Sequence, residues 1–352
     1  MRLDEILEKA LKDDVSDIHL TAGSTPIIRV HGELIRQKTE NLLPEDLEVI
    51  VKELLNEEQL GELQNEGSVD IAYSISNIGR FRVNVYIQRG SYAIAIRVVA
   101  LKIPTIDELK LPEVIKELTK LKRGLILVTG PTGSGKSTTL AAMIDYMNHN
   151  RNEHIITIED PIEFLHKHNK CIINQREIGN DTFSFSTALR SSLRQDPDII
   201  LVGEMRDLDT ISTAITAAET GHLVLSTVHT IGAANTIERI VDVFPPYQQQ
   251  QIKIQLSSVL QGVISQQILP KANGDGRVAA FEILRSITAT QNLIREGKAH
   301  QLQTVIQTNS RLGMVTMDAS LIELFNKRII TKEILLRYAI DKKAVKRQIG
   351  YY

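Results

Sequence analysis

The sequence predicts an α/β protein in two parts: a small α+β domain over residues 1–100, and a larger domain over 113–352 that is built on a mostly parallel sheet and ends in helices. Three observations support this prediction. Apolar and polar residues alternate in the first part, short aliphatic segments alternate with helical patterns from Gly124, and the pattern is wholly helical from about residue 286. Prolines at 104 and 112 indicate a linker over residues 101–112.

The first part combines helical patterns with alternating strands. Helices are expected at residues 3–13 and, after Pro44, at 45–55. Strands are expected in PIIRVHGELI, VDIAYSI, RFRVNVYIQ and SYAIAIRVV. Alternation of apolar and polar side chains is typical of an antiparallel sheet with one buried face, so these residues predict a small α+β domain.

In the second part, helical patterns separate short aliphatic strands. The strands are expected in GLILVTG, HIITIED, DIILVGE and HLVLSTVH. A helix is expected after the first of them, and two more at about 184–194 and at 208–219. This order predicts a parallel sheet covered by helices on both faces.

The composition is that of a soluble globular protein. The chain has 352 residues, is 42% apolar and 24% charged, and carries a net charge of -2, which gives no overall attraction to nucleic acid. The single cysteine, Cys171, excludes an internal disulfide framework and a four-cysteine zinc site. The acid-rich N-terminus is unlike a signal peptide and no apolar run approaches the length of a membrane span, so we expect a cytoplasmic protein.

The segment GPTGSGKS, residues 130–137, fits the pattern of a phosphate-binding loop between a strand and a helix. Glycines let the backbone wrap so that its N–H groups face a phosphate chain, and the following helix adds the positive end of its dipole. Lys136 would reach the β- and γ-phosphates of ATP, and the Ser137 hydroxyl would bind Mg²⁺. The predicted ATP-binding residues are Gly130, Pro131, Thr132, Gly133, Ser134, Gly135, Lys136, Ser137 and Thr138.

Other polar side chains follow the ends of the predicted parallel strands, the edge at which such sheets bind ligands. Glu159, Asp160 and Glu163 follow one strand, Glu204 follows a second, and His229 follows a third. Each alone is compatible with a solvated loop residue, and His229 with an ordinary polar strand end. Their joint position after a phosphate loop favours a catalytic site, in which His229 would sense the γ-phosphate.

Four segments in this order resemble those of the secretion-type hexameric ATPases: GPTGSGKST, ITIEDPIE, LRQDPDIILVGEMRD and HLVLSTVHT. Within that superfamily the chain resembles the type IV pilus retraction ATPases over nearly its full length. The resemblance implies a RecA-like P-loop core with a helical C-terminal end, preceded by a PAS-like α+β domain. Related assembly ATPases usually have a longer N-terminus and a four-cysteine zinc module, and one cysteine excludes that module.

The resemblance also implies a role for the acids. Glu204 would hold the hydrated Mg²⁺ together with Ser137, and Glu163 would polarise the attacking water, although the two glutamates could exchange roles. Phosphoryl transfer needs mainly positioning and charge neutralisation, which carboxylates can supply. Arg190 and Arg194 stand four residues apart on an expected helix and so share one face. They form either a solvated basic face or a pair near a nucleotide at a subunit or domain boundary.

One segment departs from the family. The retraction ATPases tend to carry Ala-Ile-Arg-Asn-Leu in a C-terminal helix, whereas this chain has Ala289-Thr290-Gln291-Asn292-Leu293. No residue of this segment belongs to the nucleotide-binding segments, so we expect hydrolysis to be unaffected.

The hairpin RFRVNVYIQRGSYAIAIRVV carries two further candidates. A two-residue turn at Arg89-Gly90 pairs Gln88 with Ser91 and thereby sets Arg82 opposite Arg97. Like charges opposed across strands are unfavourable by a few tenths to about 1 kcal/mol, so we expect an anion to offset them. Either a nearby carboxylate does so, or both side chains act as arginine fingers on the triphosphate of ATP when the N-terminal domain closes over it.

These observations favour a homohexameric ATPase that uses ATP and Mg²⁺ to pull on a pilus base by changing the orientation of its domains. The expected partner is a platform protein of the inner membrane. The hexamer would lie at the cytoplasmic face of that membrane and would associate with it through partners only. No nucleic acid is expected. The alternatives are an accessory or assembly ATPase of a related pilus or type II secretion system, a RecA-like nucleic-acid motor, and a scaffold that binds nucleotide without turning it over. With no Trp and only 4% aromatic residues, a nucleic-acid channel would have few stacking side chains.

Overall fold

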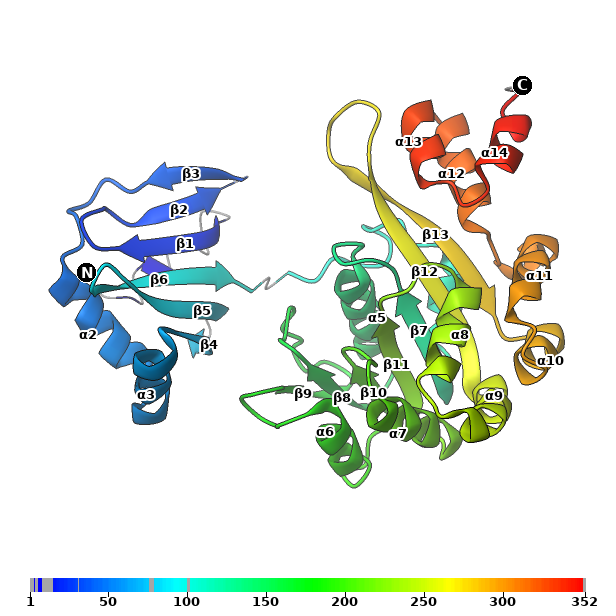
Figure 1. Ribbon diagram of the computed structural model, residues 1–352, viewed down its shortest axis with the longest axis horizontal. Helices are drawn as coiled ribbons and strands as arrows, with labels where there is room; N and C mark the ends of the chain where they lie inside the picture. Colours follow the sequence, from blue (N-terminus) through cyan, green and yellow to red (C-terminus); the bar gives the residue numbers. More distant parts are fainter. Residues whose placement is uncertain are drawn as a thin grey trace. The chain divides into compact units, whose positions relative to one another are not determined.

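The computed structural model describes residues 3, 6–7, 15–30, 32–75, 79–99 and 102–350 (Figure 1). The chain forms two compact units. One contains Met1–Lys102 and Glu163–Leu165, and the other contains Ile103–Ile162 and His166–Tyr352. Within the described residues, no helix has both the length and the apolar composition needed to cross a membrane.

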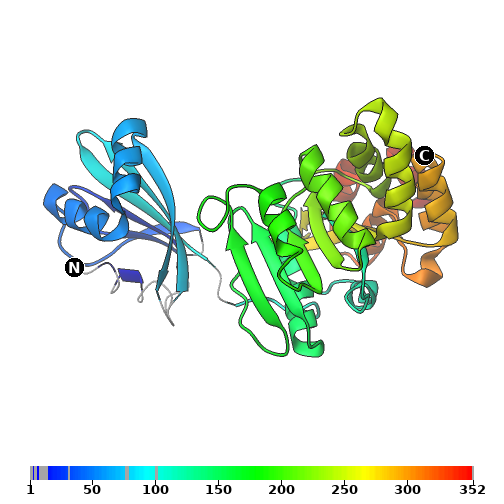
Figure 2. The same cartoon turned by 90° about the horizontal axis from the view of Figure 1, so that it is seen from below.

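The first unit is built on a six-stranded antiparallel sheet of order β3-β2-β1-β6-β5-β4. Its strands are β1 (Val15–Thr21), β2 (Ile27–Val30), β3 (Glu33–Arg36), β4 (Ser68–Ile75), β5 (Gly79–Gln88) and β6 (Ser91–Val98). Two helices, α2 (Pro44–Leu54) and α3 (Glu57–Glu66), pack on one face of this sheet (Figure 2). The core between them contains Leu47, Leu63, Phe81, Val83 and Ile94, and the predicted antiparallel α+β architecture is confirmed.

Two details of this unit differ from the sequence prediction. The segment PIIRVHGELI is not one strand, because β2 and β3 pair as a hairpin with Val30 opposite Glu33. Gly32 makes this turn possible with a φ of 90°, which L side chains rarely adopt. Helix α3 was not predicted, since it buries only Leu63 fully and therefore shows a weak helical pattern. The helix expected at residues 3–13 lies largely outside the described residues.

The hairpin register predicted from the sequence is confirmed. Gln88 pairs with Ser91, and Arg82 lies directly opposite Arg97. The turn residues Arg89 and Gly90 have φ values of 49° and 78°, as a two-residue turn between twisted strands requires.

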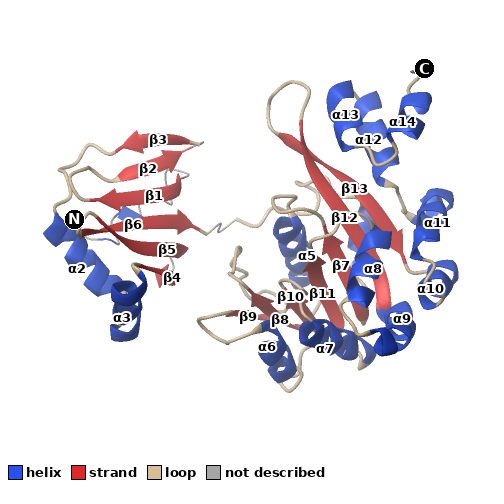
Figure 3. Ribbon diagram, viewed as in Figure 1, coloured by secondary structure: helices blue, strands red, loops and turns tan. Residues whose placement is uncertain are grey.

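The second unit is built on a seven-stranded sheet of order β13-β12-β7-β11-β10-β8-β9 (Figure 3). The strands are β7 (Gly124–Thr129), β8 (His154–Glu159), β9 (Ile172–Glu177), β10 (Ile199–Val202), β11 (Leu223–Val228), β12 (Leu260–Pro270) and β13 (Arg277–Arg285). All neighbours are parallel except β12 and β13, which form an antiparallel hairpin. The parallel core was predicted, whereas β9, β12 and β13 were not.

Helices cover both faces of this sheet, as predicted. Alternate strand residues on one face pack against α6 (Phe185–Ser192), α7 (Leu208–Glu219), α8 (Ala233–Asp242) and α9 (Pro246–Val259). Those on the other face pack against α4 (Glu113–Leu118) and α5 (Lys136–Asn150). A strand buried on both faces needs aliphatic side chains at every position, which explains the uninterrupted apolar segments of the sequence.

The chain ends in helices, as predicted. These are α10 (Thr288–Arg295), α11 (Leu302–Thr308), α12 (Met317–Asn326), α13 (Lys332–Tyr338) and α14 (Lys342–Gln348), with short 3-10 turns at Ala299–Gln301 and Ser310–Leu312. The last three pack with the outer end of the β12–β13 hairpin around Leu269 and Ala280.

Candidate nucleotide site

The loop at residues 130–137 connects β7 to α5 and has the geometry of a phosphate cradle. Gly130, Gly133 and Gly135 have φ values of 144°, 77° and 85°. A Cβ atom on Gly130 would lie 2.3 Å from the Gln266 carbonyl oxygen, and one on Gly135 would lie 3.0 Å from Ile268 Cδ1. The loop therefore needs glycine both for its backbone conformation and for its close approach to β12.

Lys136 is 8% exposed and lies inside this loop. Its Nζ donates hydrogen bonds to the carbonyl oxygens of Gly130 at 3.1 Å and Pro131 at 3.2 Å. Helix α5 begins at Lys136 without a side-chain cap and without an acid in its first turn. The first N–H groups of the helix, the positive end of its dipole and the ammonium group are thus gathered in one place, which suits an anion.

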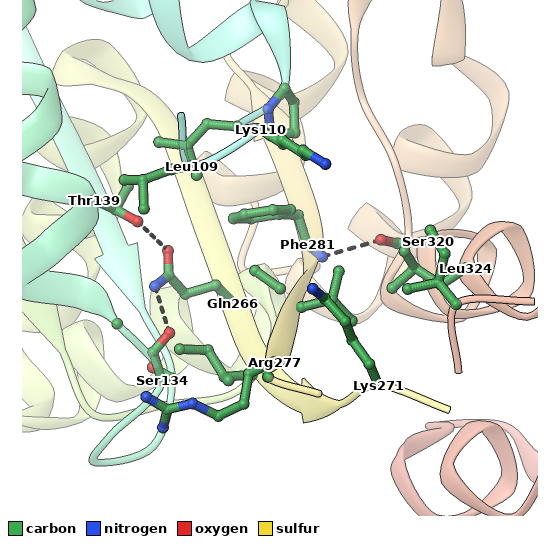
Figure 4. A pocket seen from close by; sticks show the side chains of 18 of the residues that line it. Leu109, Lys110, Ser134, Thr139, Gln266, Lys271, Arg277, Phe281, Ser320 and Leu324 are labelled. Carbon is green, nitrogen blue, oxygen red and sulfur yellow. Dashed lines mark hydrogen bonds between the residues drawn. The ribbon is translucent and has the colours of Figure 1, made fainter. Parts of the chain in front are cut away.

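The loop is braced from the neighbouring strand by Gln266, which the sequence analysis missed (Figure 4). This side chain is buried; its Nε2 donates to the Ser134 carbonyl oxygen at 2.6 Å, and its Oε1 accepts from Thr139 Oγ1 at 2.9 Å. A polar Gln pair within the aliphatic segment of β12 is the signal that could have revealed it. Because both ends of the amide are used, Gln266 fixes the loop against the start of α5.

Strand order brings two of the predicted catalytic side chains together next to this loop. His229 follows β11, which adjoins β7, and Glu204 follows β10, the next strand along. The His229 Nε2 atom is 3.6 Å from Glu204 Oε2, and Arg206 Nε is 2.8 Å from the same oxygen. Glu204 is 20% exposed, so its charge is only partly screened by solvent.

Lys136 lies close enough to His229 to affect its protonation. Burial lowers the pKa of His229 most, and the Lys136 ammonium lowers it further. The Glu204 carboxylate raises this pKa, but the pKa stays below its ordinary value. His229 is therefore neutral near pH 7, and its ring can both donate and accept a hydrogen bond. The lysine, the imidazole and the carboxylate form one cluster at the carboxyl edge of the sheet.

The acids after β8 occupy different environments. Glu159 accepts hydrogen bonds from Thr157 Oγ1 at 2.7 Å and Gln175 Nε2 at 3.1 Å, so it serves the local structure. Glu163, which belongs to the first unit, is exposed, and its side chain forms no hydrogen bond or ion pair within the part of the chain that the structure describes. The residue before it is anchored, because the Ile162 N–H donates to the buried carboxylate of Glu177 at 2.9 Å.

The arginine pair Arg190 and Arg194 does not share a helical face as expected. Helix α6 ends at Ser192, and Arg194 lies in the turn that leads to β10. Both side chains are exposed, Arg190 is 3.8 Å from Asp209 Oδ1, and Arg194 Nη1 is 3.4 Å from the Arg190 carbonyl oxygen. A helix that precedes a parallel strand ends at the amino edge of the sheet, so within one subunit this pair lies at the edge opposite to the phosphate loop.

Arg82 and Arg97 belong to the first unit, and one of them has a carboxylate partner there. Asp17 on β1 lies opposite Arg97, and its Oδ1 accepts a 2.9 Å hydrogen bond from Arg97 Nε. The side chain of Arg82 forms no hydrogen bond or ion pair with any described residue. A nearby carboxylate therefore offsets the charge of Arg97, as one of the two alternatives expected. Arg82 is exposed, and no carboxylate among the described residues pairs with it.

The departure in helix α10 has a local structural explanation. The Thr290 side chain is buried, and its Oγ1 accepts from the Ile287 N–H at 2.8 Å. Gln291 Nε2 donates to Ser286 Oγ at 3.1 Å. Both side chains therefore stabilise the start of α10, the place where a capping group is worth about 1 kcal/mol.

The groups present fit a magnesium ion that arrives with a nucleotide. Among the described residues no three His, Cys, Asp or Glu side chains gather into a metal-binding group. Mg²⁺ commonly binds one or two protein oxygens together with substrate phosphates and water. The Ser137 hydroxyl in the first turn of α5 and the partly buried Glu204 carboxylate are oxygen donors of this kind.

Comparisons with known proteins agree with this geometry. The family model described as type II/IV secretion system protein matches residues 1–347. The chain is 48% identical to the type IV pilus retraction ATPase PilT of Pseudomonas aeruginosa, over 95% of this chain and 96% of that one. It is 46% identical to a twitching motility protein of Neisseria gonorrhoeae, over 94% and 90%.

Solved structures give the same result. The crystal structure of the pilus retraction motor PilT with bound ADP matches with a TM-score of 0.91 and 49% identity, and covers 99% of each chain. The ATPase DotB of Legionella pneumophila matches with a TM-score of 0.82 and 28% identity, over 95% of this chain and 93% of that one. The chain belongs to the type II/IV secretion system protein family, and within it to the type IV pilus retraction ATPases.

Proposed function

We propose that this ATPase drives the retraction of type IV pili by hydrolysing ATP. The observation that carries the proposal is the cluster of Lys136, His229 and Glu204 beside the phosphate loop, in a chain that matches retraction ATPases over almost its whole length. Such a cluster can neutralise and orient a triphosphate, which is most of what phosphoryl transfer requires of a protein.

Each side chain has a defined task in this proposal. The loop N–H groups and Lys136 bind the β- and γ-phosphates. Ser137 and Glu204 would hold hydrated Mg²⁺, which would neutralise developing charge. Glu163 takes a proton from the attacking water as the water oxygen bonds to the γ-phosphorus. The bond between the γ-phosphorus and the bridging oxygen breaks, and that oxygen leaves with ADP. Neutral His229 donates a hydrogen bond to the γ-phosphate. Glu163 and Glu204 could exchange roles.

The arginines would complete the site in an assembly. We propose a homohexamer in which Arg82 and Arg97, from the N-terminal domain, and Arg190 and Arg194, near a boundary between subunits, approach the nucleotide. An arginine that meets the γ-phosphate only in the ATP state couples domain orientation to hydrolysis. The resulting domain rotation would act on a platform protein at the cytoplasmic face of the inner membrane, and no nucleic acid takes part.

A second candidate is an accessory ATPase of a pilus system. The type IV pilus ATPase PilU of Pseudomonas aeruginosa is 40% identical over 96% of this chain, so the same fold and site fit that protein as well. A type II secretion function is less well supported, because the chain spans only 53% of the type II secretion system protein E of Aeromonas hydrophila.

The test is deletion of the gene in its native host, with phosphate release measured on the purified protein. The proposal expects steady-state ATP hydrolysis that DNA does not stimulate, together with a hyperpiliated, non-motile deletion strain. A strain without pili would instead indicate an assembly function, and a strain with normal motility would contradict retraction. Binding of ATP without turnover would indicate a scaffold, and stimulation by DNA a nucleic-acid motor.

A further inference from the structure

The β12–β13 hairpin extends past the phosphate loop. Strand β12 pairs with β7 only as far as Ser265 opposite Thr129, and beyond that point it pairs with β13 alone up to Pro270 opposite Arg277. The two strands therefore form a ribbon that continues beyond the carboxyl end of β7, visible in Figure 1 as the long yellow hairpin.

One face of this ribbon covers the loop and the start of α5. On β12, Gln266 donates a hydrogen bond to the Ser134 carbonyl oxygen, and Ile268 approaches Gly135 so closely that a Cβ atom there would lie 3.0 Å from Ile268 Cδ1. The residues directly opposite these on β13 are Phe281 and Ala279. Residues directly opposed in an antiparallel pair project to the same face, so all four side chains face the loop.

Arg277 continues this row. It lies opposite Pro270, two residues beyond Ile268, which is about 7 Å farther along the strand. By the same alternation its side chain is on the face that covers the loop. In Figure 4 the guanidinium group extends from the end of the hairpin back toward Ser134, and the two residues line the same pocket.

This pocket has a volume of about 1150 Å³ and opens beside the phosphate loop. Ser134, Gly135 and Thr138 form its wall on the loop side, whereas Lys136, Ser137, Glu204 and His229 do not line it. The pocket is therefore on the side of the loop away from the hydrolytic cluster. A phosphate reached from this side is one of those held by the loop backbone, and not the γ-phosphate next to Glu204.

The charges around the pocket favour an anion. Both acids that line it have partners: Glu323 pairs with Lys327 at 2.5 Å, and Glu108 Oε2 accepts from the Thr105 N–H at 2.8 Å. Arg277 is exposed, and its side chain forms no hydrogen bond or ion pair with a described residue. Its guanidinium is charged at any accessible pH and can bind a phosphate through two parallel hydrogen bonds. The cations that line the pocket are Lys110, Lys271, Arg277, Lys327 and Arg328.

We propose that Arg277 binds the α- or β-phosphate of the nucleotide from the hairpin side. This inference rests on the proposed function, ATP hydrolysis. Lys136 and the loop N–H groups would then hold the phosphates from inside the loop, and Arg277 would reach them from the end of the loop that lines the pocket, at Ser134 and Thr138. Because ADP and ATP share these phosphates, Arg277 contributes equally to the binding of both and little to the chemical step.

The test is the affinity of the full-length protein for ADP, measured by calorimetry, beside steady-state ATP hydrolysis. Arg277→Gln should weaken ADP binding about tenfold or more and raise KM for ATP in parallel, with kcat within about twofold of the unsubstituted protein. Arg277→Lys should bind ADP with an intermediate affinity, because it keeps the charge and loses the paired hydrogen bonds. Arg311→Gln is the matched control, since Arg311 is exposed in the turn Ser310–Leu312 and does not line the pocket.

Two results would overturn the inference. One is ADP affinity of Arg277→Gln within twofold of the unsubstituted protein, and the other is loss of kcat with unchanged ADP affinity, which would place Arg277 at the γ-phosphate. Melting temperatures without nucleotide should agree among all variants, and only the increase on adding ADP should differ. Failure of the unsubstituted protein to bind ADP would contradict the proposed function itself, so the two failures are distinguishable.

Discussion

Asp17 and Arg97 lie directly opposite each other on β1 and β6, joined by a 2.9 Å hydrogen bond between Asp17 Oδ1 and Arg97 Nε. Burial raises the pKa of Asp17, but hydrogen bonds from Arg97 and Ser16 outweigh it and hold that pKa below its ordinary value. On the other side of Arg97 lies Arg82, without a partner among the described residues. The two arginines of this row therefore have different surroundings and should respond differently to substitution.

Arg82→Ala should leave the melting temperature without nucleotide unchanged or slightly raised, because it removes a like charge opposite Arg97. Arg97→Ala should cost roughly 0.2–1 kcal/mol, the range for a solvent-exposed ion pair, and should raise the pKa of Asp17. If Arg82 is an arginine finger, Arg82→Ala also lowers kcat at least tenfold with ADP affinity retained. Thermal melts and steady-state kinetics check these values; a normal kcat in Arg82→Ala would remove Arg82 from the mechanism.

The glutamates and the loop lysine should separate binding from turnover. Lys136→Ala should weaken nucleotide binding, because it removes the ammonium group that lies inside the loop. Glu204→Gln and Glu163→Gln should keep ATP bound and lower turnover by about two orders of magnitude or more, because each loses the charge that positions Mg²⁺ or water. ATP binding and single-turnover hydrolysis measure the two effects. Normal turnover in Glu163→Gln would make the segment after β8 structural only.

His229 should titrate below the ordinary range for histidine. The causes are burial, then repulsion from Lys136, with Glu204 acting in the opposite direction. Lys136→Ala should therefore raise the pKa of His229, and Glu204→Gln should lower it further. NMR titration of the imidazole signals in the three proteins checks both signs. Movement of the pKa in the same direction in both variants is the result that this electrostatic account does not allow.

His166 should make the protein sensitive to acid. Burial lowers the pKa of His166 from 6.5 to about 4. The imidazole is therefore protonated less readily in the folded protein than in the unfolded chain. The stability that neutral His166 contributes is fully present above about pH 6.5 and is lost as the pH falls toward 4, up to about 3 kcal/mol in total.

His166→Gln cannot take up the proton, so its stability should fall less between pH 7 and pH 4.5 than that of the unsubstituted protein. Urea unfolding at the two pH values measures the difference. Equal losses in both proteins would mean that His166 is not the group responsible.

The sequence was sufficient for the parallel core because its strands are aliphatic at every position and end in polar residues at one edge. The hairpin register was also predictable, since a two-residue turn fixes every cross-strand pair between Arg82 and Arg97. Both inferences depend on short-range patterns alone.

Contacts between distant segments could not be predicted in the same way. Strand β12 is buried on nearly every position, so it shows no alternation that would identify it or place Gln266 against the loop. Asp17 is 80 residues from Arg97, and only the strand order brings them together. Arg190 and Arg194 do not share the expected helical face because α6 ends at Ser192, and a helix end frays over one or two residues that an apolar pattern does not mark.

The most direct test of the central claim is time-lapse imaging of labelled pili in a deletion strain that expresses either the unsubstituted chain or Glu204→Gln. If hydrolysis beside Lys136 and His229 drives retraction, the unsubstituted chain restores the shortening of extended pili. Glu204→Gln, present at the same cellular level, leaves pili extended. Shortening of pili in cells that contain only Glu204→Gln would contradict the account.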